Sequence, residues 1–382
     1  MALSSRFGIV AVAVTVVACG GPAMPPAPLP PALEPVASAM PAASSSAAPV
    51  ASASTSSPTA SADPPKLTAR AVMLPGGPPV TMDYLAFEPA AKRVWVPGGN
   101  TGKAFVIDTE TSKLTEVTGF KTVEREARGQ KRVVGPSSAT VGEGVLFVGN
   151  RADSKVCAVD ASTLKMGACV TLASSPDGLQ YVKATKEVWV TTPNDSSLTI
   201  LDVSHVAALK VKATLKLEGE PEGYALDDAR GIFYTNLENK DRTLAIDVKS
   251  RKVLSTWKPE CGEAGPRGVA LDAQRRWLFV ACTTKVLTMD VGAGDGKILG
   301  SVDTGAGVDN IDYVAGKRFV YAAAGKAGTL TIAKVDDAGG LKVVATAATA
   351  PGTRVVVADD RGRAWIADSA GGRILVVEPP AL

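Results

Sequence analysis

Charged side chains recur at one place in this sequence, shortly before a series of aromatic residues, and they are the residues best suited to hold a ligand. The six that lie eleven or twelve positions before an aromatic residue are Asp83, Asp177, Glu222, Arg267, Asp309 and Arg354. Ser138 takes the equivalent place before Phe147, and Asn310 adds a neutral oxygen beside Asp309. Converging carboxylates would bind a hard cation such as Ca²⁺, and arginines would hold an anionic ligand through paired hydrogen bonds. Whether a metal binds stays open.

The signatures of the common enzyme classes are absent from the sequence. A single histidine, His205, excludes any site that needs two imidazoles, and with it most transition-metal centres. The chain contains no Gly-x-Ser-x-Gly motif, no phosphate-binding loop and no His-Glu-x-x-His motif. Its 41 basic and 38 acidic residues give a net charge of +3, so we expect no nucleic-acid partner. We assign no catalytic residue and expect no cofactor, with Ca²⁺ as the one alternative.

The charged residues belong to a unit that occurs seven times. Each unit has an apolar segment, a polar turn, an apolar–aromatic segment, a second turn with Asn or Gly, and a segment that ends in an acidic residue. The aligned aromatic residues are Trp95, Phe147, Trp189, Phe233, Phe279, Tyr321 and Trp365. Their spacings are 52, 42, 44, 46, 42 and 44 residues, and the longest reflects an insertion at 121–134.

This repeat predicts an all-β, seven-bladed β-propeller over residues 66–382. Four short strands in about 40–45 residues are typical of one antiparallel blade. The seventh unit ends after its third strand, so we expect residues 67–74, ahead of the first unit, to supply the missing outer strand. An N-terminal strand in the last blade would close the ring and leave no long open edge.

The predicted fold would gather the polar residues described above at one opening. The first strand of each blade lines the central channel, so its first residue would stand on the rim of one mouth. Loops such as 149–155 would share that face, and the insertion would form a flap beside it. Two interpretations stay open, a functional ligand site or merely a solvated opening, and the insertion could equally be a plain surface loop.

Three sequence features resemble the YVTN-type β-propeller family. They are the Pro-x-Gly start of several units, the Leu/Val-aromatic-Val segment, and the Ile/Val-Asp-x-x-Thr/Ser turn seen in IDTETSK (107–113) and VDASTLK (159–165). The resemblance extends over 66–382, although Trp or Phe stands where the family has Tyr-Val. It implies a seven-bladed propeller but no single function, because this architecture serves binding proteins, scaffolds and enzymes alike.

The cysteines are consistent with an oxidising compartment. Cys157 and Cys169 flank a turn and should face each other across a hairpin, and Cys261 and Cys282 should lie at one end of the fifth blade. We favour two disulfide bonds, because free thiols oxidise in an exported protein. A four-cysteine metal cluster is the alternative, but the sequence has no paired Cys-x-x-Cys spacing.

The N-terminal 65 residues are predicted to direct and tether the protein. Residues 1–19 place Arg6 before an apolar stretch and Ala18-Cys19, the pattern of a secretory signal peptide. Their end resembles the lipobox of bacterial lipoproteins, which implies a lipidated Cys19; a secreted protein with a chance cysteine is the alternative. Residues 20–65 are nearly all Ala, Pro, Ser and Thr, so we expect a disordered tether.

Taken together, these features favour an exported binding or scaffolding module of the bacterial cell envelope. The propeller would lie in the periplasm or at the cell surface, held to the membrane only by its lipid. We expect a monomer that binds a small polar ligand or an envelope protein. The alternative is a Ca²⁺-assisted hydrolase or lactonase that uses the carboxylates at the mouth. A third possibility is a purely structural protein that docks by its top face or its blade edges.

Overall fold

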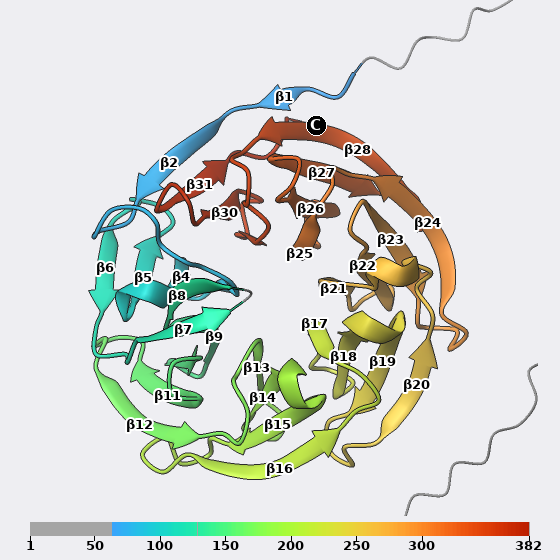
Figure 1. The fold of residues 1–382 in the computed structure, drawn as a ribbon. Coiled ribbons are helices and arrows are strands. Elements are labelled where there is room, and N and C mark those ends of the chain that lie inside the picture. The colour runs from blue at the N-terminus through green and yellow to red at the C-terminus, as the bar shows by residue number, and fades with distance from the viewer. Residues whose placement is uncertain (1–62, 128, 382) are drawn as a thin grey trace, which may run out of the picture. The chain divides into compact units, whose positions relative to one another are not determined.

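Seven four-stranded antiparallel sheets stand around a central axis as the blades of a ring (Figure 1). This computed structural model describes residues 63–127 and 129–381. The predicted signal peptide, Cys19 and nearly all of the predicted tether therefore lie outside the described residues. The prediction of an all-β, seven-bladed propeller is confirmed.

Within each blade the first strand lies nearest the axis and the chain then runs outward. The strands are β3 (Ala86–Glu88), β4 (Arg93–Gly98), β5 (Lys103–Asp108) and β6 (Leu114–Val117) in blade 1; β9 (Pro136–Gly142), β10 (Val145–Asn150), β11 (Lys155–Asp160) and β12 (Met166–Thr171) in blade 2; β13 (Leu179–Val182), β14 (Glu187–Thr192), β15 (Ser197–Asp202) and β16 (Lys210–Lys216) in blade 3; and β17 (Pro221–Asp227), β18 (Ile232–Leu237), β19 (Arg242–Asp247) and β20 (Val253–Trp257) in blade 4.

The remaining blades follow the same order. They are β21 (Val269–Asp272), β22 (Trp277–Ala281), β23 (Lys285–Asp290) and β24 (Lys297–Asp303) in blade 5; β25 (Val308–Val314), β26 (Phe319–Ala324), β27 (Thr329–Val335) and β28 (Leu341–Ala348) in blade 6; and β29 (Val356–Ala358), β30 (Ala364–Asp368), β31 (Arg373–Val377) and β2 (Ala69–Met73) in blade 7. Short 3₁₀ turns occur at η1 (Gly99–Thr101), η2 (Pro193–Asp195), η3 (Glu238–Lys240) and η4 (Gly262–Ala264).

The N-terminal end of the propeller closes the ring, as the sequence predicts. Strand β2 pairs antiparallel with β31 and becomes the outer strand of blade 7. The two-residue strand β1 (Lys66–Leu67) adds a parallel fifth strand to blade 6, beside β28. Figure 1 shows both strands running along the outside of the last two blades. The sequence did not predict the contact of β1.

The hydrophobic core is divided among the interfaces between blades. The described residues form seven apolar clusters, and each is shared by two neighbouring blades. All seven aligned aromatic residues are at most 1% exposed. Because the second and third strands are covered on both faces, they read as continuous apolar runs, whereas an outer strand such as β12 alternates between half-buried and exposed residues.

The Pro-x-Gly motif has a steric reason near the axis. A Cβ atom on Gly223 would lie 2.4 Å from Cα of Gly268 in the next blade. A Cβ atom on Gly178 would lie 2.1 Å from the ring of Tyr224. Glycine at these positions therefore lets neighbouring first strands approach closely around the channel.

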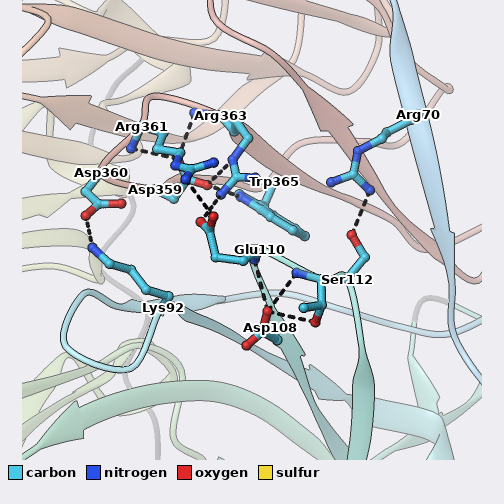
Figure 2. A network of polar contacts seen from close by, with 11 residues as sticks. Arg70, Lys92, Asp108, Glu110, Ser112, Asp359, Asp360, Arg361, Arg363 and Trp365 are labelled. Atoms are coloured by element: carbon cyan, nitrogen blue, oxygen red, sulfur yellow. Dashed lines mark hydrogen bonds and ion pairs between the residues drawn. The ribbon is translucent and has the colours of Figure 1, made fainter.

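A polar network joins blade 7 to blade 1 at the end of the ring where the first strands finish (Figure 2). Glu110 accepts hydrogen bonds from Arg361 Nη2 at 2.6 Å and from Arg363 Nη2 at 3.1 Å. Lys92 pairs with Asp360 beside them. These contacts tie the last blade to the first at the site of ring closure.

Asp359 is the buried centre of that network. Its carboxylate accepts hydrogen bonds from Arg363 Nε at 2.7 Å and from the indole N–H of Trp365 at 3.0 Å. Asp359 is 1% exposed and Arg363 is 6% exposed. Removing the carboxylate would therefore leave the buried Nε of Arg363 and the buried indole N–H of Trp365 without their acceptor, while Arg363 would keep only Glu110.

Both predicted disulfide bonds are present. Cys157 and Cys169 lie directly opposite each other on β11 and β12. Cys261 and Cys282 join the segment before β21 to the residue after β22. These bonds are compatible with an exported protein. The part of the chain that the structure describes has no helix with the length and hydropathy needed to cross a membrane.

We expect Gly223→Ala to lower the free energy of unfolding by about 1–3 kcal/mol, because the new methyl group would push against the backbone of blade 5. Gly316→Ala is the matched control, since no atom lies within 4 Å of its added Cβ. Urea unfolding of the two variants measures the difference. Equal stability of both variants would contradict the steric explanation of the motif.

Asp359→Ala should lower the free energy of unfolding by about 3–5 kcal/mol, because it removes the acceptor of the buried Arg363 Nε and of the buried Trp365 indole and leaves Arg363 only its longer contact with Glu110. The neighbouring Asp360→Ala should cost no more than about 1 kcal/mol, because its partner Lys92 is solvent-exposed. Chemical unfolding of the two variants separates these expectations. A loss below about 1 kcal/mol for Asp359→Ala would show that the network does not stabilise ring closure.

Candidate functional site

Five charged residues alternate in sign around one mouth of the channel. Arg151 Nη2 donates to Asp83 Oδ2 at 2.8 Å and also to Asp177. Arg354 pairs with Asp309 at 2.7 Å and approaches Asp83 at 3.7 Å. The resulting row, Asp177–Arg151–Asp83–Arg354–Asp309, links blades 3, 2, 1, 7 and 6. It spans the site of ring closure and brings together four of the residues that the sequence placed on the rim.

The carboxylates of this row are crowded and poorly hydrated. Burial raises the pKa of Asp177 to about 6, and the neighbouring Asp83 carboxylate adds to this effect while Arg151 opposes it. Burial also raises the pKa of Asp309, against the pull of Arg354. One arginine shared between two acids cannot neutralise both, so Asp177 keeps its proton to higher pH than an exposed aspartate.

Two tyrosines, Tyr84 and Tyr224, stack beside the row. The hydroxyl of Tyr84, in blade 1, donates to Glu222 Oε1 of blade 4 at 2.6 Å, across the axis. The rings of Tyr84 and Tyr224 stack with centroids 5.6 Å apart. Burial, together with the Asp177 and Asp309 carboxylates, raises the pKa of Glu222 well above its usual range. The mouth is therefore a bowl with an aromatic floor.

Three residues of the predicted ring stand apart from the row. Arg267 turns to Glu238 of blade 4, with which it forms an ion pair. Ser138 is fully buried, and its hydroxyl lies beside Gly149 inside blade 2. Asn310 uses its backbone N–H to bond the carbonyl oxygen of Arg354 at 3.0 Å. The ring of polar residues is therefore uneven, and its ion pairs are concentrated on one side.

The insertion between blades 1 and 2 forms a hairpin at this mouth. Its strands are β7 (Val123–Ala127) and β8 (Gln130–Val134), and Figure 1 shows them reaching inward toward the axis. A hydrogen bond from Arg125 Nη2 to the carbonyl oxygen of Ala152, at 3.2 Å, fastens the hairpin to blade 2. The predicted flap is thus a two-stranded arm that extends over the mouth.

A cavity of about 290 Å³ lies between this hairpin and blades 1 and 7, and we call it the hairpin pocket. Its lining includes three arginines, one acidic residue and two serines, namely Arg132, Arg151, Arg354, Asp83, Ser137 and Ser369. Its volume is at the small end of the range for ligand pockets. The rim of the propeller therefore includes a half-open pocket as well as an open bowl.

No three His, Cys, Asp or Glu side chains among the described residues are grouped so that they could hold a metal ion. Guanidinium groups stand between the carboxylates of the rim, between Asp83 and Asp177 on one side and between Asp83 and Asp309 on the other. The Ca²⁺-assisted hydrolase stays a prediction from the sequence alone.

Sequence reasoning missed several residues that shape the mouth. The sequence places Arg151 in the loop 149–155 without singling it out, although it bridges Asp83 and Asp177 in the ion-pair row. Tyr84 and Tyr224 were not identified, although each lies within two positions of a rim acid. Their proximity to Asp83 and Glu222 is the signal that could have found them, because neighbouring residues of a channel strand reach the same opening.

Comparison with solved structures supports the fold. A chain in the "Crystal Structure of Mitotic Checkpoint Complex" superposes with a TM-score of 0.68 at 14% identity, covering 87% of this chain and 99% of that one. A chain of "Kuenenia stuttgartiensis Hydrazine Synthase" superposes with a TM-score of 0.67 at 14% identity, covering 80% of this chain and 96% of that one. The Myceliophteria thermophila Cps50 (Swd1) β-propeller domain superposes with a TM-score of 0.62 at 12% identity, covering 81% of this chain and 99% of that one. No protein-family profile and no curated protein matches the sequence.

The raised pKa of Asp177 predicts a pH-dependent stability. Between about pH 4 and pH 6 the folded state retains a proton that the unfolded state loses, so the free energy of unfolding falls as the pH rises. The loss is at most about 3 kcal/mol. Asp177→Asn should remove this part of the slope in chemical unfolding measured at several pH values.

The control for that experiment is Asp360→Asn. The pKa of Asp360 is lowered by its hydrogen bond with Lys92, so this carboxylate is already ionised in the same pH range. The control should keep the slope of the wild-type protein. An unchanged slope in Asp177→Asn would contradict the assignment of the proton to Asp177.

Proposed function

We propose that this chain is an exported, lipid-anchored β-propeller that acts as a binding module in the bacterial cell envelope. The mouth at which the hairpin lies is its binding surface, and the ligand is a small polar molecule or the polar surface of an envelope protein. The resemblance to the YVTN-type family is part of this proposal.

The observation that carries the proposal is the construction of the mouth. The row of alternating charges holds Arg151 and Arg354 in fixed positions, and Tyr84 is held in turn by its hydrogen bond to Glu222 across the axis. A rigid concave surface with a few fixed polar groups is the usual form of a ligand site. Propellers also serve widely as scaffolds, which makes an envelope protein a suitable second class of partner.

Export is supported by two independent features. The first 19 residues follow the signal-peptide pattern and end in Cys19. The two disulfide bonds, Cys157–Cys169 and Cys261–Cys282, are typical of oxidising compartments. A membrane anchor at Cys19 would leave the whole propeller free to bind in the periplasm or at the cell surface.

The anchor is tested with Cys19→Ser in a bacterial host grown with labelled palmitate. The wild-type protein should take up the label and sediment with membranes, whereas Cys19→Ser should do neither, because it lacks the thiol that receives the lipid. An unlabelled, freely soluble wild-type protein would contradict lipid anchoring and leave secretion without an anchor.

The binding surface is tested by ligand-dependent thermal stability and by cross-linking in envelope extracts. The wild-type protein is compared with Asp83→Asn, which breaks the row at its centre, and with Asp360→Asn on the opposite face. At least one polar ligand or cross-linked envelope protein should be lost in Asp83→Asn and kept in Asp360→Asn. If binding in both assays is indifferent to Asp83, the mouth is not the binding surface.

A further inference from the structure

The hairpin pocket has more positive than negative side chains in its wall. Arg132 comes from the hairpin, Arg151 from the end of β10 and Arg354 from the start of blade 7. Asp83 is the one acidic residue of the lining. A guanidinium group suits a planar or tetrahedral anion, because it can donate two parallel hydrogen bonds, and Arg151 and Arg354 bring two such groups to the pocket.

Arg151 has donors to spare for such a ligand. In the described part of the chain it contacts Asp83 and Asp177 through Nη2 alone, which leaves Nε and Nη1 without a protein acceptor. The two aspartates fix the guanidinium in place before any ligand arrives. An arginine that is already ordered loses little side-chain entropy on binding, which favours affinity.

Arg354 can also bind an anion, because one of its two contacts with acidic residues is weak. It pairs with Asp309 at 2.7 Å, but its approach to Asp83 is long at 3.7 Å. Its side chain is 51% exposed, so solvent reaches it at the mouth. An incoming anion can take the place of this weak contact with Asp83 while Asp309 continues to position the side chain.

A buried hydroxyl provides the second, independent sign of a ligand. Ser137 lines the pocket and is only 6% exposed, and its Oγ has no hydrogen-bond partner among the described residues. Buried polar atoms in native proteins almost always have a partner, so an unpaired one needs an explanation. An anion in the pocket would supply an acceptor for this hydroxyl.

Apolar side chains form another part of the wall, beside the hydroxyl groups of Thr81 and Ser369. Val133 on the hairpin is 39% exposed, and Val134, Val355 and Met82 also line the cavity. An exposed valine on an arm that reaches over a pocket would be covered by the body of a ligand. The volume of about 290 Å³ allows only a small one.

We infer that the hairpin pocket binds a small organic anion, with its carboxylate or phosphate group held by Arg151, Arg354 and the hydroxyl of Ser137, and its apolar body against Val133 and Val355. This inference rests on the proposed function and names the ligand class of the mouth. The hairpin supplies one wall of the site. Among the described residues, such an insertion occurs only between blades 1 and 2.

The test uses probes that have the same shape and different charge. Benzoate and phenyl phosphate carry the anionic group on a small ring, and benzamidinium carries a cation in its place. Binding to the purified full-length protein is measured by calorimetry and thermal shift at up to about 10 mM probe. Benzoate or phenyl phosphate should bind and raise the melting temperature, and benzamidinium should not. Preference for phenyl phosphate over benzoate, or the reverse, distinguishes the phosphate from the carboxylate as the natural group.

Variants locate the bound anion. Arg354→Gln should weaken the affinity for the anionic probe about tenfold or more, and Arg354→Lys should restore part of it, because lysine keeps the charge but loses the paired donors. Ser137→Ala should weaken it by a smaller factor. Arg361→Gln is the control, since Arg361 pairs with Glu110 on the opposite face of the ring. Circular dichroism and thermal unfolding without probe show whether each variant is folded.

The outcomes separate this inference from the proposed function. If benzamidinium binds and the anions do not, the carboxylates of the bowl hold the ligand. That result overturns the inference of an anion-binding pocket, whereas the mouth remains a binding surface. Anion binding that is equal in Arg354→Gln and Arg361→Gln overturns it as well. Failure of every anionic probe at about 10 mM also overturns it, whereas the proposed function is judged separately, by the loss of partners in Asp83→Asn.

Discussion

Closure of the ring by β2 is the constraint on which the rest of this structure depends. The pairing of β2 with β31 completes blade 7 and removes the last open edge between the two ends of the chain. From β2 the chain runs along blade 7, where Leu74 and Val80 donate backbone hydrogen bonds to Gly372 and Ser369. It then enters the mouth at Asp83. The segment that closes the ring therefore also carries the central acid of the candidate site.

This coupling explains why the mouth is asymmetric although the repeat is regular. Asp83 lies between Arg151 and Arg354 because its blade stands between theirs, and Tyr84 next to it reaches across the axis to Glu222. Blades 4 and 5 take no part in the row, since Arg267 pairs with Glu238 instead. Side chains that could do chemistry are concentrated where the repeat is interrupted, at the closure and at the inserted hairpin.

The fold could be predicted from the sequence because its determinants are local and repeated. The seven aromatic residues follow one another at nearly constant spacing, and each is buried between blades. The opposed cysteines of β11 and β12 follow from hairpin geometry, since residues at equal distances from a turn face each other. Glycine follows three of the rim residues, at Gly178, Gly223 and Gly268, and reflects close packing around the channel in those units.

The sequence by itself thus determined the number of blades, the closing strand and the disulfide pairs, and it placed the rim residues within three positions of the start of each channel strand. Only the tertiary structure decided how those residues are used. Whether a rim carboxylate meets an arginine, a tyrosine or a metal depends on side chains from blades that are far apart in the chain, such as Tyr84 and Glu222. No local pattern records such a contact, because its geometry exists only once the ring is closed. For the same reason the hairpin pocket, which three separate segments enclose, could not be seen before the chain was folded.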